Sequence, residues 1–172
     1  YQTLEKLLDK KKKRNFKELL INSQLQKNNN IIAEIKKASP SAGTIINDYM
    51  PENIAMKYER SGIGAISILT EQDFFKGHLD HLSLVYENSN LPILRKDFIF
   101  DPYQILQSKI YHADAILLIL SILSDNQIKE FIEIANNYNL DCLIEIHTKI
   151  EEFPGSLQAD KEYRQYNIRN DY

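Results

Sequence analysis

The sequence predicts an α/β fold of the TIM (β/α)8-barrel type, with about five of the eight strand–helix units recognisable and an extra helix at the N-terminus. Short apolar segments alternate with amphipathic segments of helical period, which is typical of parallel strands covered by helices. Charged residues follow several of the apolar segments. A barrel brings the carboxyl ends of its strands to one mouth, so these charges would meet there.

An open, doubly wound sheet is the other architecture that fits this alternation. However, no apolar segment is followed by G-x-G-x-x-G or by G-x-x-x-x-G-K-[ST]. These loops bind phosphates in the nucleotide-binding versions of that fold. The charged strand ends therefore favour the barrel.

Composition indicates an ordinary globular domain. Of 172 residues, 43% are hydrophobic and 26% are charged, and the formal net charge is −3. We expect a cytoplasmic protein without a nucleic-acid or membrane partner, either monomeric or weakly associated through open barrel edges. The basic run Lys10–Arg14 is interpreted as a solvated helix face, and Cys142 as a packed, inert thiol.

The first elements follow from apolar spacing and from helix-ending residues. Leucines at spacings of three and four predict a helix over Thr3–Gln26. The apolar start of Ile31–Lys36 predicts the first strand, followed by a loop to Met50. Pro51 is expected to begin a second helix, which ends at Ser61.

The same alternation then repeats. The predicted strands are Ala65–Leu69, Pro92–Leu94, Ala113–Leu120 and Asp141–Ile146. The predicted helices are Leu79–Glu87, Tyr103–Tyr111 and Ser124–Tyr138. Asp101 and Ser124 are expected to cap the two later helices.

Three regions are predicted: an N-terminal extension helix over 1–28, a partial barrel over 29–150 and a polar tail over 151–172. A closed barrel needs eight strand–helix units. The chain is therefore expected to be a fragment, to lack internal segments, or to fold differently in its last part.

The stretch after the first strand contains the first candidate site residues. Glu34 and Lys36 end a strand that starts as an apolar run. Burying such charges is costly unless they meet partners or a ligand. Ser39, in the following Ser/Pro/Gly loop, offers a hydroxyl to an anion.

The chain resembles the indole-3-glycerol phosphate synthase family in five successive segments: IAEIKKASPSAG, AISILTEQDFFKG, PILRKDFIFDPYQI, ADAILLI and LIEIH. The leading helix is similar to the N-terminal extension of that family. The resemblance implies a lyase of tryptophan biosynthesis. Its phosphorylated substrate, 1-(2-carboxyphenylamino)-1-deoxyribulose 5-phosphate, closes to an indole with loss of carbon dioxide and water. It also implies that no metal and no organic cofactor take part.

By position in these motifs, the resemblance implies four catalytic residues. Lys96 matches the general acid and Glu145 the acid/base carboxylate. Lys36 matches a lysine that contacts the substrate carboxylate, and Glu34 a glutamate that orients the lysines.

Other residues are implied to bind the substrate or to support the site. Ser39 corresponds to a serine that helps to bind the phosphate, and Phe98 with Phe75 (or Phe74) would form a wall for the aromatic ring. Glu71 is expected to organise a loop rather than to catalyse. We expect His147 to be structural, and His78, His81 and His112 to lie on the surface.

Alternatives remain open at this point. The chain could be an inactive partial barrel that needs a partner chain, because the asparagine–arginine, serine and glycine-rich motifs of the family's last strands are not recognisable. Glu34 and Lys36 could form a plain ion pair, and charged strand ends could be a solvated rim. A related barrel such as phosphoribosylanthranilate isomerase is disfavoured because it lacks E-I-K-x-x-S-P-S.

Overall fold

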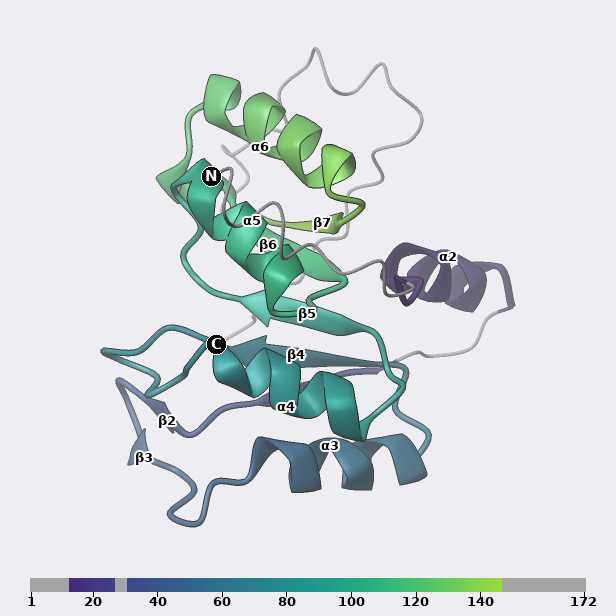
Figure 1. Cartoon of the computed structure of the whole chain (residues 1–172), viewed down its shortest axis with the longest axis vertical. Helices are drawn as coiled ribbons and strands as arrows, with labels where there is room; N and C mark the ends of the chain where they lie inside the picture. Colours follow the sequence, from purple (N-terminus) through teal and green to yellow (C-terminus); the bar gives the residue numbers. More distant parts are fainter. Residues whose placement is uncertain (1–12, 27–30, 147–172) are drawn as a thin grey trace.

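The computed structural model describes residues 13–26 and 31–146 of the chain. Its main element is a sheet of five parallel strands (Figure 1). These are β1 (Ile32–Ile35), β4 (Ala65–Leu69), β5 (Ile93–Lys96), β6 (Ala115–Ile119) and β7 (Asp141–Glu145). The helices between them are α3 (Pro51–Arg60), α4 (Asp80–Asn88), α5 (Pro102–Ile110) and α6 (Asp125–Asn137).

The strands lie in the sheet in the same order as in the chain, β1-β4-β5-β6-β7. Each strand is hydrogen-bonded in parallel to the next, with Ile32 opposite Ala65 and Ile66 opposite Ile93. A doubly wound sheet would reverse its strand order partway. The barrel prediction is therefore confirmed, as a partial barrel.

The two faces of the sheet carry different residues because side chains alternate along a strand. On the outer face, Ile66, Ile68 and Leu118 pack into the main core against the helices. The inner face contributes a smaller apolar cluster that includes Leu94 and Leu117. A barrel places its functional groups at the carboxyl ends of its strands, next to this inner cluster.

The predicted N-terminal helix differs from the structure at residues 13–15. A helix over Thr3–Gln26 was expected, but within the described residues the helix α2 is Phe16–Gln26, and residues 13–15 are not helical. The backbone N–H of Arg14 donates to the carboxylate of Asp114 (2.7 Å) instead of entering a helix. Phe16, only 2% exposed, then packs into the inner cluster.

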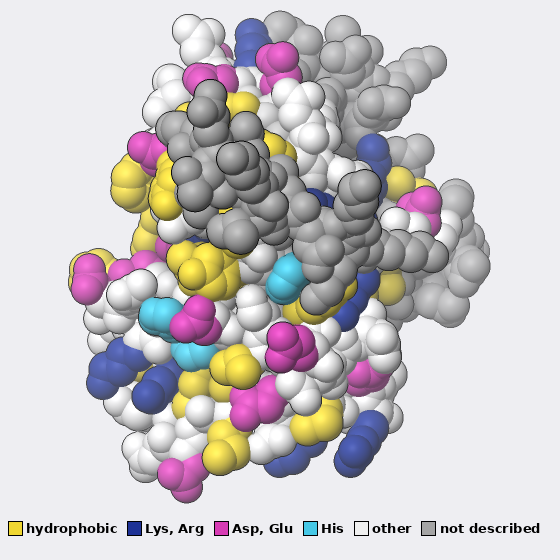
Figure 2. Space-filling view, in the orientation of Figure 1, with side chains coloured by type: hydrophobic (Ala, Val, Ile, Leu, Met, Phe, Trp, Pro, Cys, Tyr) yellow, Lys and Arg dark blue, Asp and Glu magenta, His cyan; other side chains and the backbone are white. Residues whose placement is uncertain are grey.

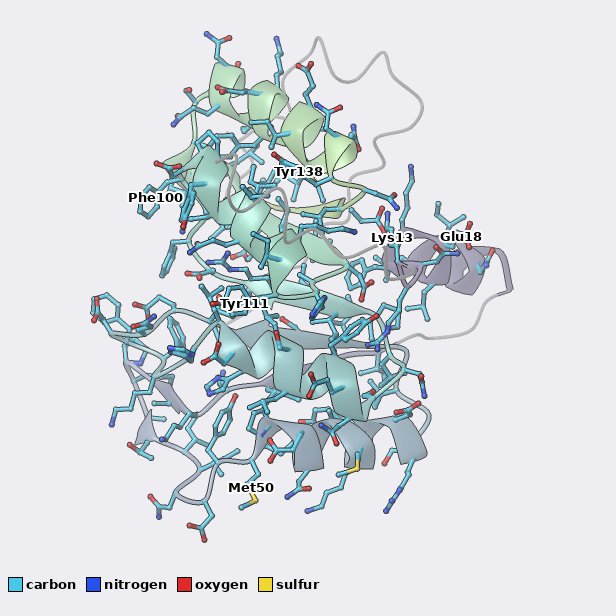
Figure 3. The ribbon with its side chains drawn as sticks, viewed as in Figure 1. Lys13, Glu18, Met50, Phe100, Tyr111 and Tyr138 are labelled. Atoms are coloured by element: carbon cyan, nitrogen blue, oxygen red, sulfur yellow. The ribbon has the colours of Figure 1, made fainter. Side chains whose placement is uncertain are left out.

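The interpretation of the basic run as a solvated helix face is wrong for its two described members. Lys13, in the segment just before α2 (Figure 3), binds the carboxylate of Asp141 at 2.6 Å. The guanidinium of Arg14 lies 4.1 Å from the ring centre of Tyr86 and donates to the carbonyl oxygens of Tyr86 and Leu91. These contacts hold α2 beside the amino ends of the strands, opposite the β2–β3 side (Figure 1).

Most predicted boundaries agree with the structure to within two residues, and both predicted caps are present. Asp101 accepts from the N–H of Tyr103, and Ser124 from that of Gln127. The expected loop after the first strand contains a small antiparallel pair, β2 (Ala38–Ser39) and β3 (Gly43–Thr44). A single turn of 3-10 helix, η1 (Leu120–Ile122), follows β6.

Cys142 packs on the outer face of β7 against the main core, as predicted. Burial raises the pKa of its thiol to about 12, so it stays protonated at neutral pH. None of the helices described is long and apolar enough to cross a membrane. Acidic and basic side chains are interspersed over the face shown in Figure 2. The predicted tail 151–172 and His147 lie outside the described residues.

Candidate active site

Three strands place ionisable side chains on the inner face of the sheet. Glu34 on β1, Lys96 on β5 and Glu145 on β7 each lie two residues after an inward apolar residue of the same strand. This alternation follows from the strand period of two. Residues that are far apart in the sequence therefore face one concave surface.

Glu34 binds two ammonium groups at once. Its Oε1 lies 2.7 Å from Nζ of Lys36, and its Oε2 lies 3.0 Å from Nζ of Lys96. Burial pushes the pKa of Glu34 upward, but the hydrogen bond from Lys36 and the charge of Lys96 outweigh this effect. The net pKa lies below the ordinary value, so the carboxylate remains ionised at neutral pH.

Lys96 and Glu145 line two adjoining pockets on this surface. The first, of about 290 Å³, is also walled by Phe75, Phe98 and Ile119. The second, of about 260 Å³, contains Glu34. An apolar wall beside a few acid and base groups is typical of a small-molecule site.

Glu145 is the most enclosed of the catalytic candidates, with an exposed fraction of 8%. It ends β7 opposite Ile119 of β6. Ser67, on β4, also lines the second pocket, and its buried hydroxyl has no hydrogen-bond partner among the described residues. A ligand or a water is the ordinary partner of such a group.

Of the predicted substrate-binding residues, the two phenylalanines line a pocket and the serine does not. Phe75 is half-buried and Phe98 is 41% exposed, and both line the first pocket. Ser39 lies outside both pockets, and its Oγ accepts the N–H of Ala42 (3.2 Å) within the small hairpin. The structure thus joins six of the seven predicted residues through shared pockets and ion pairs, but not Ser39.

The loop after β4 is organised by Glu71, as predicted. Its carboxylate accepts the N–H groups of Asp73, Phe74 and Phe75 at 2.8–3.0 Å. These bonds fix Phe75 at the pocket. Glu71 therefore acts as a structural anchor of this wall.

Two of the three histidines expected on the surface are half-buried instead. His81 packs edge-on against Tyr49, with ring centres 5.1 Å apart, and His112 stacks on Tyr86 at 4.6 Å. His78 is exposed, as expected. Across residues 13–26 and 31–146, no group of His, Cys, Asp or Glu is arranged to hold a metal ion.

Sequence reasoning missed a buried polar network behind β5. Arg95 is 3% exposed and binds Asp97 and Thr70. The alternation of Leu94, Arg95 and Lys96 carried a signal for it, because Arg95 must face the helix layer when Lys96 faces the pocket.

Fold and site together define a (β/α)-barrel protein with ionisable groups at the carboxyl ends of its strands. The sequence profile described as indole-3-glycerol phosphate synthase matches residues 2–168. The chain belongs to the indole-3-glycerol phosphate synthase family.

Individual relatives agree with this assignment. The chain is 46% identical over 147 residues to an indole-3-glycerol phosphate synthase of Campylobacter jejuni subsp. doylei, covering 86% of this chain and 57% of the relative. It is 44% identical over 167 residues to one of Endomicrobium trichonymphae, covering 96% of this chain and 63% of that relative. The chain thus spans roughly three fifths of the length of these relatives.

The solved structures that match this chain are similar to it in fold alone. The crystal structure of methylornithine synthase (PylB) matches with a TM-score of 0.52 at 11% identity, covering 86% of this chain and 55% of that chain. At this identity, the likeness carries no information on chemistry.

Proposed function

We propose that this chain serves as an indole-3-glycerol phosphate synthase, a carbon–carbon lyase of tryptophan biosynthesis. It closes 1-(2-carboxyphenylamino)-1-deoxyribulose 5-phosphate to indole-3-glycerol phosphate, carbon dioxide and water. Family membership supports this proposal. The observation that carries it is that Lys96, Glu145 and Glu34 share one apolar-walled surface.

The first step needs an acid. Lys96 donates a proton to the substrate ketone as the ring carbon that bears the carboxylate attacks the ketone carbon. A carbon–carbon bond forms and the bond to the carboxylate breaks. Its electron pair restores the aromatic ring, and carbon dioxide leaves.

The second step is a dehydration. The new hydroxyl leaves as water, assisted by the ring nitrogen and a proton donor, and the neighbouring carbon loses a proton to a base. Glu145, enclosed in the pocket wall, exchanges these protons. The double bond that forms completes the indole.

The other residues hold and orient the substrate. Glu34 keeps the ammonium groups of Lys36 and Lys96 in place, and Lys36 contacts the substrate carboxylate. Phe98 and Phe75 cover the aromatic ring. Ser39 is proposed as a phosphate contact only by resemblance to the family.

A small phosphorylated molecule is thus the proposed partner, and the cytoplasm the proposed location, because the substrate is a free metabolite. The proposed state is a monomer or a weak homo-oligomer associated through the open edges of the sheet. These edges are β1 and β7, which have one hydrogen-bonded neighbour each among the described strands.

A chimera tests the proposal. The chain is fused to the part of the C. jejuni relative that lies outside the match, and the purified chimera is supplied with substrate. We expect indole fluorescence to rise with one carbon dioxide released per product. The relative's part alone serves as the control. A chimera that unfolds cooperatively but converts no substrate would contradict the proposal and favour an inactive barrel.

A further inference from the structure

Arg95 lies directly behind Lys96, on the opposite face of β5. Leu94 and Lys96 line the inner pocket, whereas Arg95 points toward α5. There its Nη1 donates to the carbonyl oxygen of Gln104 (2.8 Å) and to Oγ of Ser108 (3.0 Å). Because Arg95 is 3% exposed and faces away from the pocket, it does not touch the substrate.

The other side of the guanidinium forms hydrogen bonds with two neighbouring side chains, which also bind each other. Its Nη2 donates to Oδ2 of Asp97 (2.8 Å), and its Nε to Oγ1 of Thr70 (3.0 Å). The hydroxyl of Thr70 in turn donates to Oδ2 of Asp97 (2.6 Å). Thr70 is 2% exposed, so these bonds form in a largely dry environment where they are strong.

This network holds the backbone on both sides of Lys96. The N–H of Thr70 donates to the carbonyl oxygen of Lys96 (3.1 Å), and Oδ1 of Asp97 accepts the N–H of Phe98 (2.8 Å). The carboxyl ends of β4 and β5 are thereby tied together. The ammonium of Lys96 starts from this fixed point and reaches Glu34 at 3.0 Å.

We propose that Arg95, Thr70 and Asp97 form a positioning device that fixes the ammonium of Lys96 against Glu34. Its catalytic meaning rests on the proposed function, since it assumes that Lys96 is the acid. A displacement of about 1 Å in such a group can cost on the order of 100-fold in rate. Arg95 and Thr70 line neither pocket and therefore act through Lys96, whereas Asp97 also lines the first pocket beside Lys96.

The pKa of Glu34 reports on the position of the Lys96 ammonium and can be measured without substrate. Lys96 helps to lower it, and Glu34 lies on β1, outside the network. Thr70→Val removes the hydroxyl but keeps the N–H bond to Lys96. Ser108→Ala, the matched control, removes a hydroxyl that also contacts Arg95 but from the α5 side. Thr70→Ser restores the hydroxyl.

The titration of the Glu34 side-chain carboxyl is followed by carbon-13 NMR in the chain and its variants. We expect its midpoint to rise by about half a unit in Thr70→Val and to remain at the wild-type value in Ser108→Ala and Thr70→Ser. Lys96→Met gives the upper limit of the rise.

If Thr70→Val leaves the midpoint unchanged while Lys96→Met raises it, the device does not exist. If Lys96→Met also leaves it unchanged, the contact between Lys96 and Glu34 is absent and the inference fails. Asp97→Asn provides a second variant should Thr70→Val not fold. Failure of the proposed function appears separately, as absence of product in the chimera.

Discussion

At the scale of residues, the site depends on Glu34, which binds both lysine ammonium groups. A single carboxylate that accepts from Lys36 and Lys96 keeps two cations together at the mouth of the pocket despite their repulsion. Both lysines remain about one-third exposed. They are thus accessible to a substrate while their positions are restrained.

Removing the proposed acid should affect turnover far more than folding. In the chimera, Lys96→Met is expected to lower kcat about 100- to 10,000-fold, because general acid catalysis is lost. Thermal unfolding should change by only a few degrees, since the side chain is 37% exposed. Lys57→Met, on the exposed side of α3, is the control and should retain wild-type kcat. Near-normal kcat in Lys96→Met would show that another group is the acid.

Sequence motifs predicted which residue types would converge, because Glu34, Lys96 and Glu145 each follow an apolar strand. They could not predict the orientation of Ser39, whose Oγ is used within its own hairpin. They also missed Thr70 and Arg95, because a closed polar network depends on which strands are neighbours. That information is absent from local sequence.

At the scale of elements, the loop after β4 requires a glycine at position 77. A Cβ on Gly77 would lie 2.4 Å from the carbonyl oxygen of Leu69 and 2.8 Å from that of Glu71. Both contacts are with backbone and cannot be relieved by turning a side chain. The close approach of Gly77 to the backbone of Leu69 and Glu71 keeps Glu71 where its carboxylate holds Phe75 at the pocket.

Gly77→Ala is therefore expected to lower the free energy of unfolding by about 1–3 kcal/mol, measured by urea denaturation. Gly43→Asn is the control: its φ of +66° suits asparagine, and a Cβ there meets nothing within 4 Å. The control should change stability by less than about 1 kcal/mol. Equal stability of Gly77→Ala and the wild type would contradict the close packing of this loop.

The attachment of α2 to the sheet makes stability depend on pH. Burial raises the pKa of Asp114 from 3.8 to about 6, against the opposing hydrogen bonds from the N–H groups of Arg14 and Ile93. Between these values the folded chain holds a proton that the unfolded chain has lost. Stability from this group is therefore present at pH 4 and is lost as pH rises through 6.

Asp114 should thus lower the free energy of unfolding by at most about 3 kcal/mol between pH 4 and pH 7. Denaturation curves at both pH values should show this decrease in the wild type and a smaller one in Asp114→Asn. Asp125→Asn, at an exposed position of α6, should keep the wild-type difference. An unchanged difference in Asp114→Asn would rule out this carboxyl as the cause.

Elements with strong periodicity were predictable, whereas their ends depended on tertiary contacts. The helix predicted over Thr3–Gln26 includes residues 13–15, which are not helical because Asp114 and Asp141 bind this segment. The sequence spacing cannot reveal carboxylates more than 90 residues away. The β2–β3 pair was missed because two-residue strands carry no apolar pattern.

At the scale of the whole molecule, strand order and family membership describe a partial barrel whose inner surface carries the proposed site. Exposed aromatic residues such as Phe100 (Figure 3) and Phe98 surround the carboxyl ends of the strands. Charges and apolar walls therefore meet at one end of the sheet. The central claim is that this end binds the substrate.

The most direct measurement is to locate the ligand. The substrate with its ketone reduced to an alcohol cannot close, and it can be titrated into the nitrogen-15-labelled chain at millimolar concentration. Our account predicts that the NMR shift changes centre on Lys96, Phe98 and Glu145 and are lost in Lys96→Met. Changes centred on the outer helices α3 and α4, or no changes at all, would contradict it.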